Sequence, residues 1–155
     1  MPNTDFDFLA GSWTSVQRRL ERVLSDCDDW YEFSATLDTS VHLDGNATFD
    51  VLRSPERDLE GLTLRLYSPD EQVWRIWWAS PATGGRLDVP VVGRFDGSIG
   101  TFECDDSFEG RPIRVRYRWS DVGTEHPRWE QAFSPDSGQT WEVNWRAVFT
   151  RRVAA

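Results

Sequence analysis

Apolar and polar residues alternate with a period of two along most of this chain. The alternation is clearest in residues 62–66, 74–78, 113–119 and 141–149. A period of two is typical of antiparallel strands that bury one face and leave the other in water. The apolar members of these runs, which we expect to face the interior, are Leu62, Leu64, Leu66, Trp74, Ile76, Trp78, Ile113, Val115, Tyr117, Trp119, Trp141, Val143, Trp145, Ala147 and Phe149.

Short clusters of turn-forming residues separate the alternating runs, at 68–71, 96–97 and 134–138. A further cluster at 43–46 is expected to bend a strand. The expected strands therefore cover residues 12–20, 29–37, 40–52, 61–67, 72–79, 89–95, 98–104, 112–120, 127–133 and 140–150.

The residues ahead of the first strand predict a short helical segment over 5–10. We expect Asp5 to cap it and Phe6, Phe8 or Leu9 to cover an apolar surface. Residues 16–24 also carry apolar side chains at helical spacing, and we interpret them as a strand that runs into a loop.

About ten strands joined in order by tight turns predict an all-β, antiparallel up-and-down barrel. Closure into a barrel removes the unpaired edge strands that an open meander would leave. The chain has 155 residues and no linker-like segment, so we expect one domain spanning 1–155.

Charge narrows the choice of partners. The net charge is −9, which disfavours nucleic acid and anionic membranes as partners. All 17 basic residues are arginine, so Schiff-base chemistry on a lysine is excluded. Only two histidines and two cysteines are present. We therefore expect no metal, no cofactor and two unpaired thiols at Cys27 and Cys104.

No apolar run is long enough for a membrane helix, and the first residues lack the pattern of a secretion signal. We therefore expect a cytoplasmic protein.

Gly11-Ser12-Trp13 begins the first expected strand, and Arg151-Arg152 ends the last one. This arrangement resembles the calycin pattern of lipocalins, fatty-acid-binding proteins and avidins. The resemblance implies that a basic side chain of the last strand covers Trp13 and closes one end of the barrel. Residues 5–13 also resemble the opening of uncharacterised bacterial lipocalin-like proteins of the DUF1579-type group, a resemblance that implies a fold and no reaction.

Aromatic residues make up 14% of the chain, and they fall mainly on the expected inner face, where we also placed Phe49. They either fill the core or line a cavity for a small apolar or aromatic molecule, and both interpretations stay open. The expected ligand-binding residues are Gln17, Arg19, Tyr31, Phe33, Trp74, Trp78, Tyr117, Trp119, Gln131 and Trp145.

Arg19 shares the period of Trp13, Ser15 and Gln17, which places it on the inner face. An inward arginine among tryptophans needs an anion or a carboxylate. Fatty-acid-binding barrels, which the chain resembles, hold a carboxylate in this way. We expect Arg19, with Gln17 and Gln131, to orient a polar group of the ligand. The alternative places Arg19 at the rim in water or beside an internal glutamate.

Two other classes of function remain open. A barrel enzyme, such as a cyclase, an isomerase or a lyase, would draw its catalytic residues from Tyr117, Arg19, Gln131, Glu142 and His42. A module that binds a partner through its acidic exterior is the other class, and a second copy of the chain, in a homodimer, is one such partner. A haem-binding barrel similar to nitrobindins would require His42 or His126 as the axial ligand.

Three polar motifs are expected to be structural. Arg114, Arg116 and Arg118 predict a solvated outer face, where Glu142, Asn144 and Arg146 would join them. The carboxylates at 105–106 predict a hairpin tip. Residues 134–141 match the Asp-box pattern Ser-x-Asp-x-Gly-x-Thr-Trp, which resembles the hairpin turns of sialidase-type propellers and does not imply a glycosidase.

Overall fold

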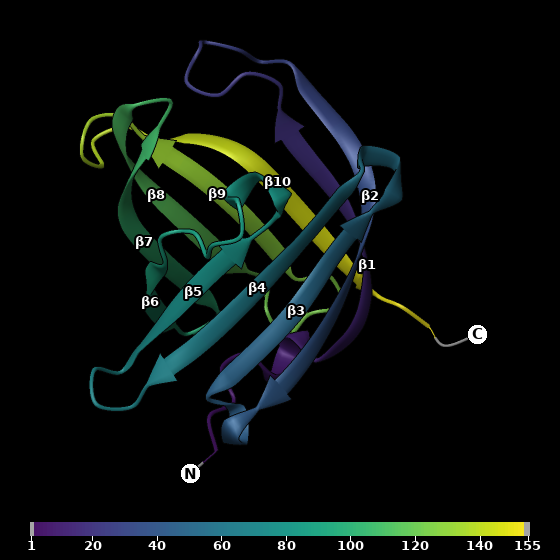
Figure 1. The fold of residues 1–155 in the computed structure, drawn as a ribbon. Helices are drawn as coiled ribbons and strands as arrows, with labels where there is room; N and C mark the ends of the chain where they lie inside the picture. Colours follow the sequence, from purple (N-terminus) through teal and green to yellow (C-terminus); the bar gives the residue numbers. More distant parts are fainter. Residues whose placement is uncertain (1, 154–155) are drawn as a thin grey trace.

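Ten antiparallel strands form a closed barrel in this computed structural model, which describes residues 2–153 (Figure 1). Each strand pairs with its neighbours in sequence, and β1 pairs with β10 to close the ring. The strands are β1 (Gly11–Leu20), β2 (Trp30–His42), β3 (Ala47–Ser54), β4 (Leu59–Ser68), β5 (Val73–Ala79), β6 (Val91–Asp96), β7 (Ile99–Phe108), β8 (Arg111–Ser120), β9 (Arg128–Ser134) and β10 (Glu142–Arg151).

Helical structure in the described residues consists of four short 3₁₀ turns, η1 (Asp7–Leu9), η2 (Leu43–Gly45), η3 (Pro55–Arg57) and η4 (Pro81–Thr83). The expected bend near residue 43 is the turn η2, which divides the predicted strand 40–52 into the end of β2 and most of β3. The all-β antiparallel barrel predicted from the alternation is confirmed.

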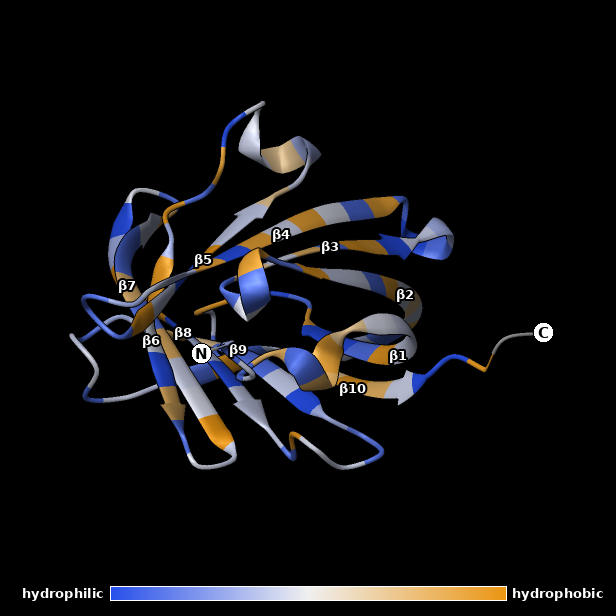
Figure 2. Cartoon of the chain, turned by 90° about the horizontal axis from the view of Figure 1, so that it is seen from below, coloured by the Kyte–Doolittle hydropathy of each residue, from blue (hydrophilic) through white to orange (hydrophobic). Residues whose placement is uncertain are grey.

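The segment before β1 closes one end of the barrel. Phe6 and Leu9 are buried there, and the ring of Phe6 meets the ring of Trp74 edge to face at 4.8 Å. Figure 2 looks along the barrel from this end and shows the segment lying across it. Asp5 does not cap η1 as expected; its carboxylate accepts a hydrogen bond from the Trp74 indole at 2.9 Å.

The seam between β5 and β6 is short. Three residue pairs join these strands, and β5 beyond Ile76 pairs with β4 alone. Residues 80–90, which we call the strap, connect the two strands across this stretch. The strap is tied back by the amide of Asp88, which donates to the carbonyl of Trp78 at 2.7 Å.

Strand β4 faces the opposite way from the prediction. Thr63 and Arg65 point into the barrel and are buried, whereas Leu62 and Leu66 are each 37% exposed on the outside. Gly61 shares the inner face, and the indole of Trp78 lies where a Cβ atom of residue 61 would sit. The alternation was recognised correctly, but both faces of β4 carry large side chains, so hydrophobicity selected the wrong face.

Two further aromatic placements were wrong. Phe49 lies on the outer face and is 39% exposed, because its neighbours Thr48 and Asp50 are the inward residues of β3. Trp141 precedes β10 and lies against the outer-face guanidinium of Arg116, 4.3 Å from the ring centroid.

A bulge in β10 changes the register between Val143 and Trp145. It brings Asn144 inside, where its side chain is buried and accepts a hydrogen bond from Gln131 at 2.8 Å. The expectation that Asn144 lies on the outer face was therefore wrong. The bulge also lets Trp145, Ala147 and Phe149 continue along the inner face.

Candidate functional site

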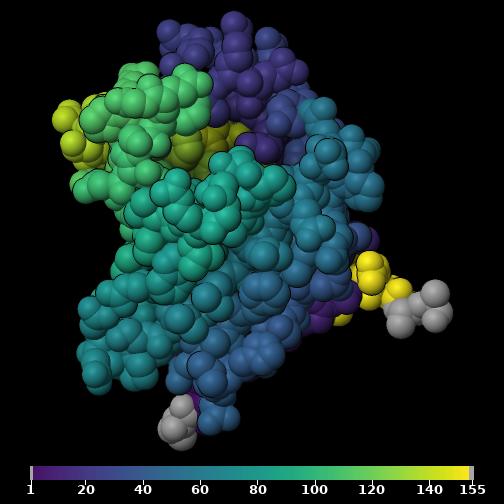
Figure 3. All heavy atoms as spheres, viewed as in Figure 1, coloured from purple at the N-terminus to yellow at the C-terminus, as the bar shows by residue number. Residues whose placement is uncertain are grey.

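A cavity of about 230 Å³ occupies the barrel on the side away from the closing segment. Figure 3 shows the molecule hollowed at this end, with yellow-green atoms visible between the teal strap and the purple connection from β1 to β2. Seven of the lining residues are aromatic, and they come from β5, β8, β9 and β10. They are Trp78, Tyr117, Trp119, Trp129, Phe133, Trp145 and Phe149.

The walls are held by ring-to-ring contacts. The rings of Trp78 and Trp145 meet edge to face at 6.0 Å, and Trp129 meets Trp145 in the same way at 5.5 Å. Tyr117 packs edge to face on Trp129 at 5.2 Å. Such contacts add to the stability gained from burial and fix the rings in place, so the wall is rigid.

Arg19 lies at the open end of the cavity. Its guanidinium carbon stands 4.0 Å from the ring centroid of Trp145, and it forms no ion pair with a carboxylate among the described residues. Burial lowers the pKa of Arg19; Tyr31 opposes this shift and Arg57 adds to it. A guanidinium keeps its charge at neutral pH regardless, so Arg19 offers a cation at the mouth.

A shallow depression beside the mouth brings together Arg19, Tyr31, Phe33 and Arg57. Arg57 covers the ring of Tyr31 at 3.9 Å. Tyr31 and Phe33 therefore lie at the rim and outside the main cavity, although both were expected to bind the ligand.

The two predicted glutamines line the cavity with much of their hydrogen-bonding capacity already used. Gln17 accepts from the indole of Trp145 at 2.7 Å and donates to Ser15 at 2.8 Å. Gln131 donates to Asn144 at 2.8 Å. Gln17 is also almost fully buried. Both side chains therefore hold neighbouring residues in place: Gln17 holds the indole of Trp145, and Gln131 holds Asn144.

Trp74 was also predicted to bind the ligand, but it lies outside the cavity. It is fully buried against Phe6 in the closed end and is not part of the cavity wall. The remaining predicted residues, Trp78, Tyr117, Trp119 and Trp145, all line the cavity.

An ion pair on the cavity wall was not predicted from the sequence. Nη1 of Arg65 lies 2.6 Å from Oδ2 of Asp50 and 3.1 Å from Oγ1 of Thr48. The side chain of Arg65 is 5% exposed and that of Asp50 is 1% exposed. A signal was available, because an aspartate and an arginine stand at inward-compatible positions of consecutive strands. This signal was obscured because the leucines of β4 are more hydrophobic and were therefore assigned to the inner face.

Tyr117 places a phenol hydroxyl on the cavity wall. Burial raises the pKa of its phenol, and the carboxylate of Asp88 on the strap raises it further. The phenol therefore stays protonated at neutral pH and presents a neutral donor.

The other catalytic candidates lie elsewhere. Glu142 accepts the amide of Leu24 at 2.7 Å, His42 contacts Ser40 at 2.8 Å, and His126 contacts Thr150 at 3.1 Å. None of the three lines the cavity. Neither histidine is therefore placed to ligate a haem inside the barrel.

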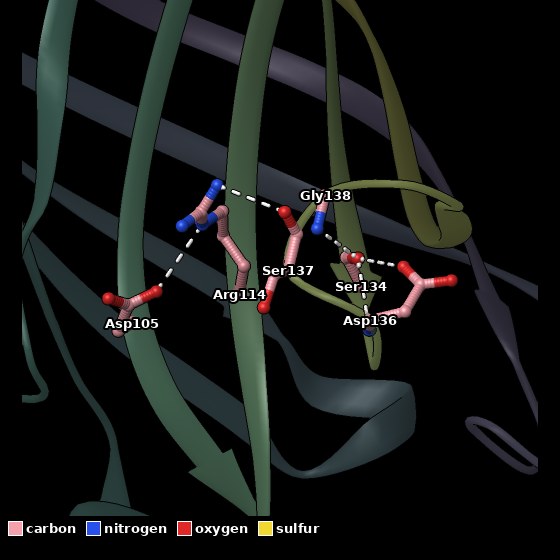
Figure 4. Close-up of polar contacts among 6 residues, drawn as sticks. All are labelled: Asp105, Arg114, Ser134, Asp136, Ser137 and Gly138. Atoms are coloured by element: carbon pink, nitrogen blue, oxygen red, sulfur yellow. Dashed lines mark hydrogen bonds and ion pairs between the residues drawn. The ribbon is translucent and has the colours of Figure 1, made fainter.

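The outer arginines and the Asp-box turn are structural. Arg114 pairs with Asp105 at 3.3 Å and donates to the Ser137 carbonyl, which ties the β9–β10 turn to β7 and β8 (Figure 4). Within the turn, Asp136 accepts from the Ser134 hydroxyl and from the amide and hydroxyl of Thr140.

No group of three or more histidine, cysteine or acidic side chains is arranged to hold a metal in the part of the chain that the structure describes. Over the same residues, no helix is long and apolar enough to cross a membrane. Both cysteines are free.

A scan against models of known protein families matches none of them, and a search of curated proteins finds no match. Among solved structures, the chain is similar to the S-type phycobiliprotein lyase CPES from Guillardia theta, with a TM-score of 0.60 at 11% sequence identity. The similarity covers 97% of this chain and 92% of that one. At this identity the likeness shows a shared fold, a barrel of the lipocalin or calycin kind.

Proposed function

We propose that the chain acts as one calycin-like domain that binds a small apolar or aromatic molecule inside the barrel. The observation that carries the proposal is the cavity of about 230 Å³ with its aromatic wall and its polar groups at both ends. Ligand sites are typically concave, mostly apolar and furnished with a few convergent polar groups.

Burial of the ligand supplies part of the affinity. Covering about 200 Å² of apolar ligand surface contributes about 5 kcal/mol before ordering costs. That value alone corresponds to a dissociation constant between millimolar and micromolar. Polar contacts with the walls must therefore supply any tighter binding, and Arg19 and the Asp50–Arg65 pair are the charged groups in position.

The test is a titration of intrinsic tryptophan fluorescence with a library of small lipophilic compounds. Trp78, Trp119, Trp129 and Trp145 line the cavity, so an internal ligand changes their emission strongly. Replacing Ala147 by Phe fills the cavity from the floor of β10 and is expected to abolish the response.

The matched control is Val16→Phe. Val16 pairs with Val148, the residue after Ala147, and lies on the outer face, where it is 47% exposed. This variant should respond like the unchanged protein. Equal responses of the two variants to every compound would remove the cavity as the binding site.

A lyase or isomerase acting in the same cavity is the second candidate. It is supported by the hydroxyl of Tyr117 on the cavity wall, which can donate a hydrogen bond to a reacting group, and the structurally similar protein from Guillardia theta is a lyase by name. Tyr117→Phe would then retain ligand binding and lose turnover, whereas a pure binding protein shows no turnover in either form.

Membership of the DUF1579-type group, on the strength of residues 5–13, and a cytoplasmic location are further parts of the proposal. The two free thiols suit a reducing compartment.

A further inference from the structure

The ion pair of Asp50 and Arg65 is joined at a single point. One nitrogen, Nη1 of Arg65, makes both contacts, to Oδ2 of Asp50 and to Thr48. Nε of Arg65 is buried and has no hydrogen-bond partner. Among residues 2–153, Asp50 uses only one of its two carboxylate oxygens in a side-chain hydrogen bond. The pair therefore keeps donors and an acceptor that the protein does not use.

Such an arrangement is costly for folding alone. A buried ion pair offsets its loss of hydration only when its geometry is good and its remaining donors and acceptors are also bonded. A bidentate arrangement of guanidinium and carboxylate would meet that condition within the protein. Here both side chains line the cavity, so a guest molecule can reach them.

The surroundings favour a flat guest. The guanidinium carbon of Arg65 stands 5.0 Å from the ring centroid of Phe6 and 5.9 Å from that of Trp119. Phe6 belongs to the closed end of the barrel, so the pair lies deep, whereas Arg19 lies at the mouth. Trp119 is also part of the cavity wall.

The charge of the pair selects the chemistry of the guest. Asp50 and Arg65 neutralise one another. A carboxylate placed beside them would be repelled by the negative charge of Asp50, and the repulsion is strong because the site is shielded from water. An ammonium in the same place would be repelled by the positive charge of Arg65. A neutral group that accepts from the guanidinium and donates to the carboxylate avoids both costs.

We propose that the Asp50–Arg65 pair recognises a neutral group in which an N–H and a C=O lie side by side, as in a lactam, a cyclic imide or another cis-amide. The carbonyl accepts from Arg65 and the N–H donates to the free oxygen of Asp50. The ligand is then a flat apolar molecule with an amide edge at its deep end. This inference rests on the proposed function, since it requires that the cavity admits a ligand.

The experiment compares three bicyclic probes: the lactam carbostyril, its N-methyl derivative and naphthoate. Binding is followed by calorimetry and by the indole N–H signals of the tryptophans in NMR spectra. Carbostyril is expected to bind about tenfold more tightly than either of the other two, because only it offers both a donor and an acceptor without charge.

The decisive variant is the double replacement D50L/R65M. Exchanging both members of a buried pair for apolar residues of similar size preserves folding, whereas removing one leaves a buried charge. In the double variant the preference for carbostyril should fall below about twofold. The control R53M/E60L removes an exposed pair from the outside of β3 and β4 and should keep the preference.

The outcomes separate the two proposals. Equal binding of carbostyril and its N-methyl derivative, tighter binding of naphthoate, or a preference that survives D50L/R65M overturns the amide assignment alone. If none of the three probes, nor any compound of the lipophilic library, shifts the indole signals, the proposed function fails and the amide assignment fails with it.

Discussion

The guanidinium carbon of Arg151 lies 4.2 Å from the ring centroid of Trp13, so the last strand covers the tryptophan at the start of the first. The same guanidinium donates to the carbonyl oxygens of Ala10 at 2.8 Å and Phe8 at 3.2 Å. The indole of Trp13 donates to the carbonyl of Leu9 at 2.8 Å. Together these contacts hold the closing segment against the barrel.

Replacing Arg151 by Met is therefore expected to loosen that end. The variant loses one cation–π contact and two hydrogen bonds, which lowers the free energy of unfolding by about 2 kcal/mol. Urea denaturation followed by tryptophan emission measures the change. Arg152→Met is the control, because the Arg152 side chain is exposed and its amide still bonds Ser12. Equal stability of the two variants would show that the closing contact contributes nothing.

The contact between Trp13 and Arg151 was expected from a short motif, and the strand order followed from alternation and turns. The contact joins residues far apart in the chain and was expected only from the resemblance to the calycin pattern. The strands and turns are local features, because each is recognisable within about ten residues. For this reason the ten strands and their order could be predicted without knowing any tertiary contact.

The facing of β4 could not be predicted in the same way. Leu62, Leu64 and Leu66 make the outer face the more apolar one, and the decision depends on residues of other strands. Arg65 turns inward because Asp50 of β3 is there to pair with it. The bulge near Val143 is equally hidden, because one extra residue leaves little trace in the sequence.

Gly61 and Trp78 offer a second test. A Cβ atom on residue 61 would lie 1.8 Å from the Trp78 ring, so Gly61→Ala forces the indole to move. We expect a loss of about 1–3 kcal/mol in the free energy of unfolding and weaker ligand binding. The near-ultraviolet circular dichroism of the Trp78–Trp145 pair should change as well.

The double variant G61A/W78F is the control for that steric argument. Phenylalanine lacks the outer ring atoms that a Cβ atom would strike, so the double variant should regain most of the stability that Gly61→Ala loses. Trp78→Phe alone is the reference for the double variant. If Gly61→Ala costs as much in the Trp78→Phe background as in the unchanged protein, the close approach of the ring is not the reason for the glycine.

The Asp136 turn predicts a dependence of stability on pH. Hydrogen bonds from Thr140, and then from Ser134, lower the pKa of Asp136 from 3.8 to about 2. A lowered pKa in the folded state means that the carboxylate stabilises the fold above pH 4. This stabilisation disappears as the pH falls from about 4 to about 2. Asp136→Asn should thus be less stable than the unchanged protein at pH 7 and equally stable at pH 2, as measured by urea denaturation. A difference that stays constant across this range contradicts the assignment.

Cys104 is expected to react slowly as a thiol in the folded protein. Burial, followed by the carboxylates of Asp106, Asp88 and Asp105, raises its pKa to about 12, and thiolate is the reactive form. In a Cys27→Ser background, labelling by a disulfide reagent should therefore be slow at neutral pH and rapid after unfolding. The native rate should rise about tenfold per pH unit, because the thiolate fraction does so below the pKa.

Asp106→Asn in that background should speed the labelling by removing a neighbouring negative charge. Asp96→Asn, at the exposed last residue of β6, should leave the rate unchanged. Rapid labelling of the folded protein at neutral pH would show that Cys104 is neither desolvated nor surrounded by negative charge. The wall of the barrel beside the strap would then be open to water.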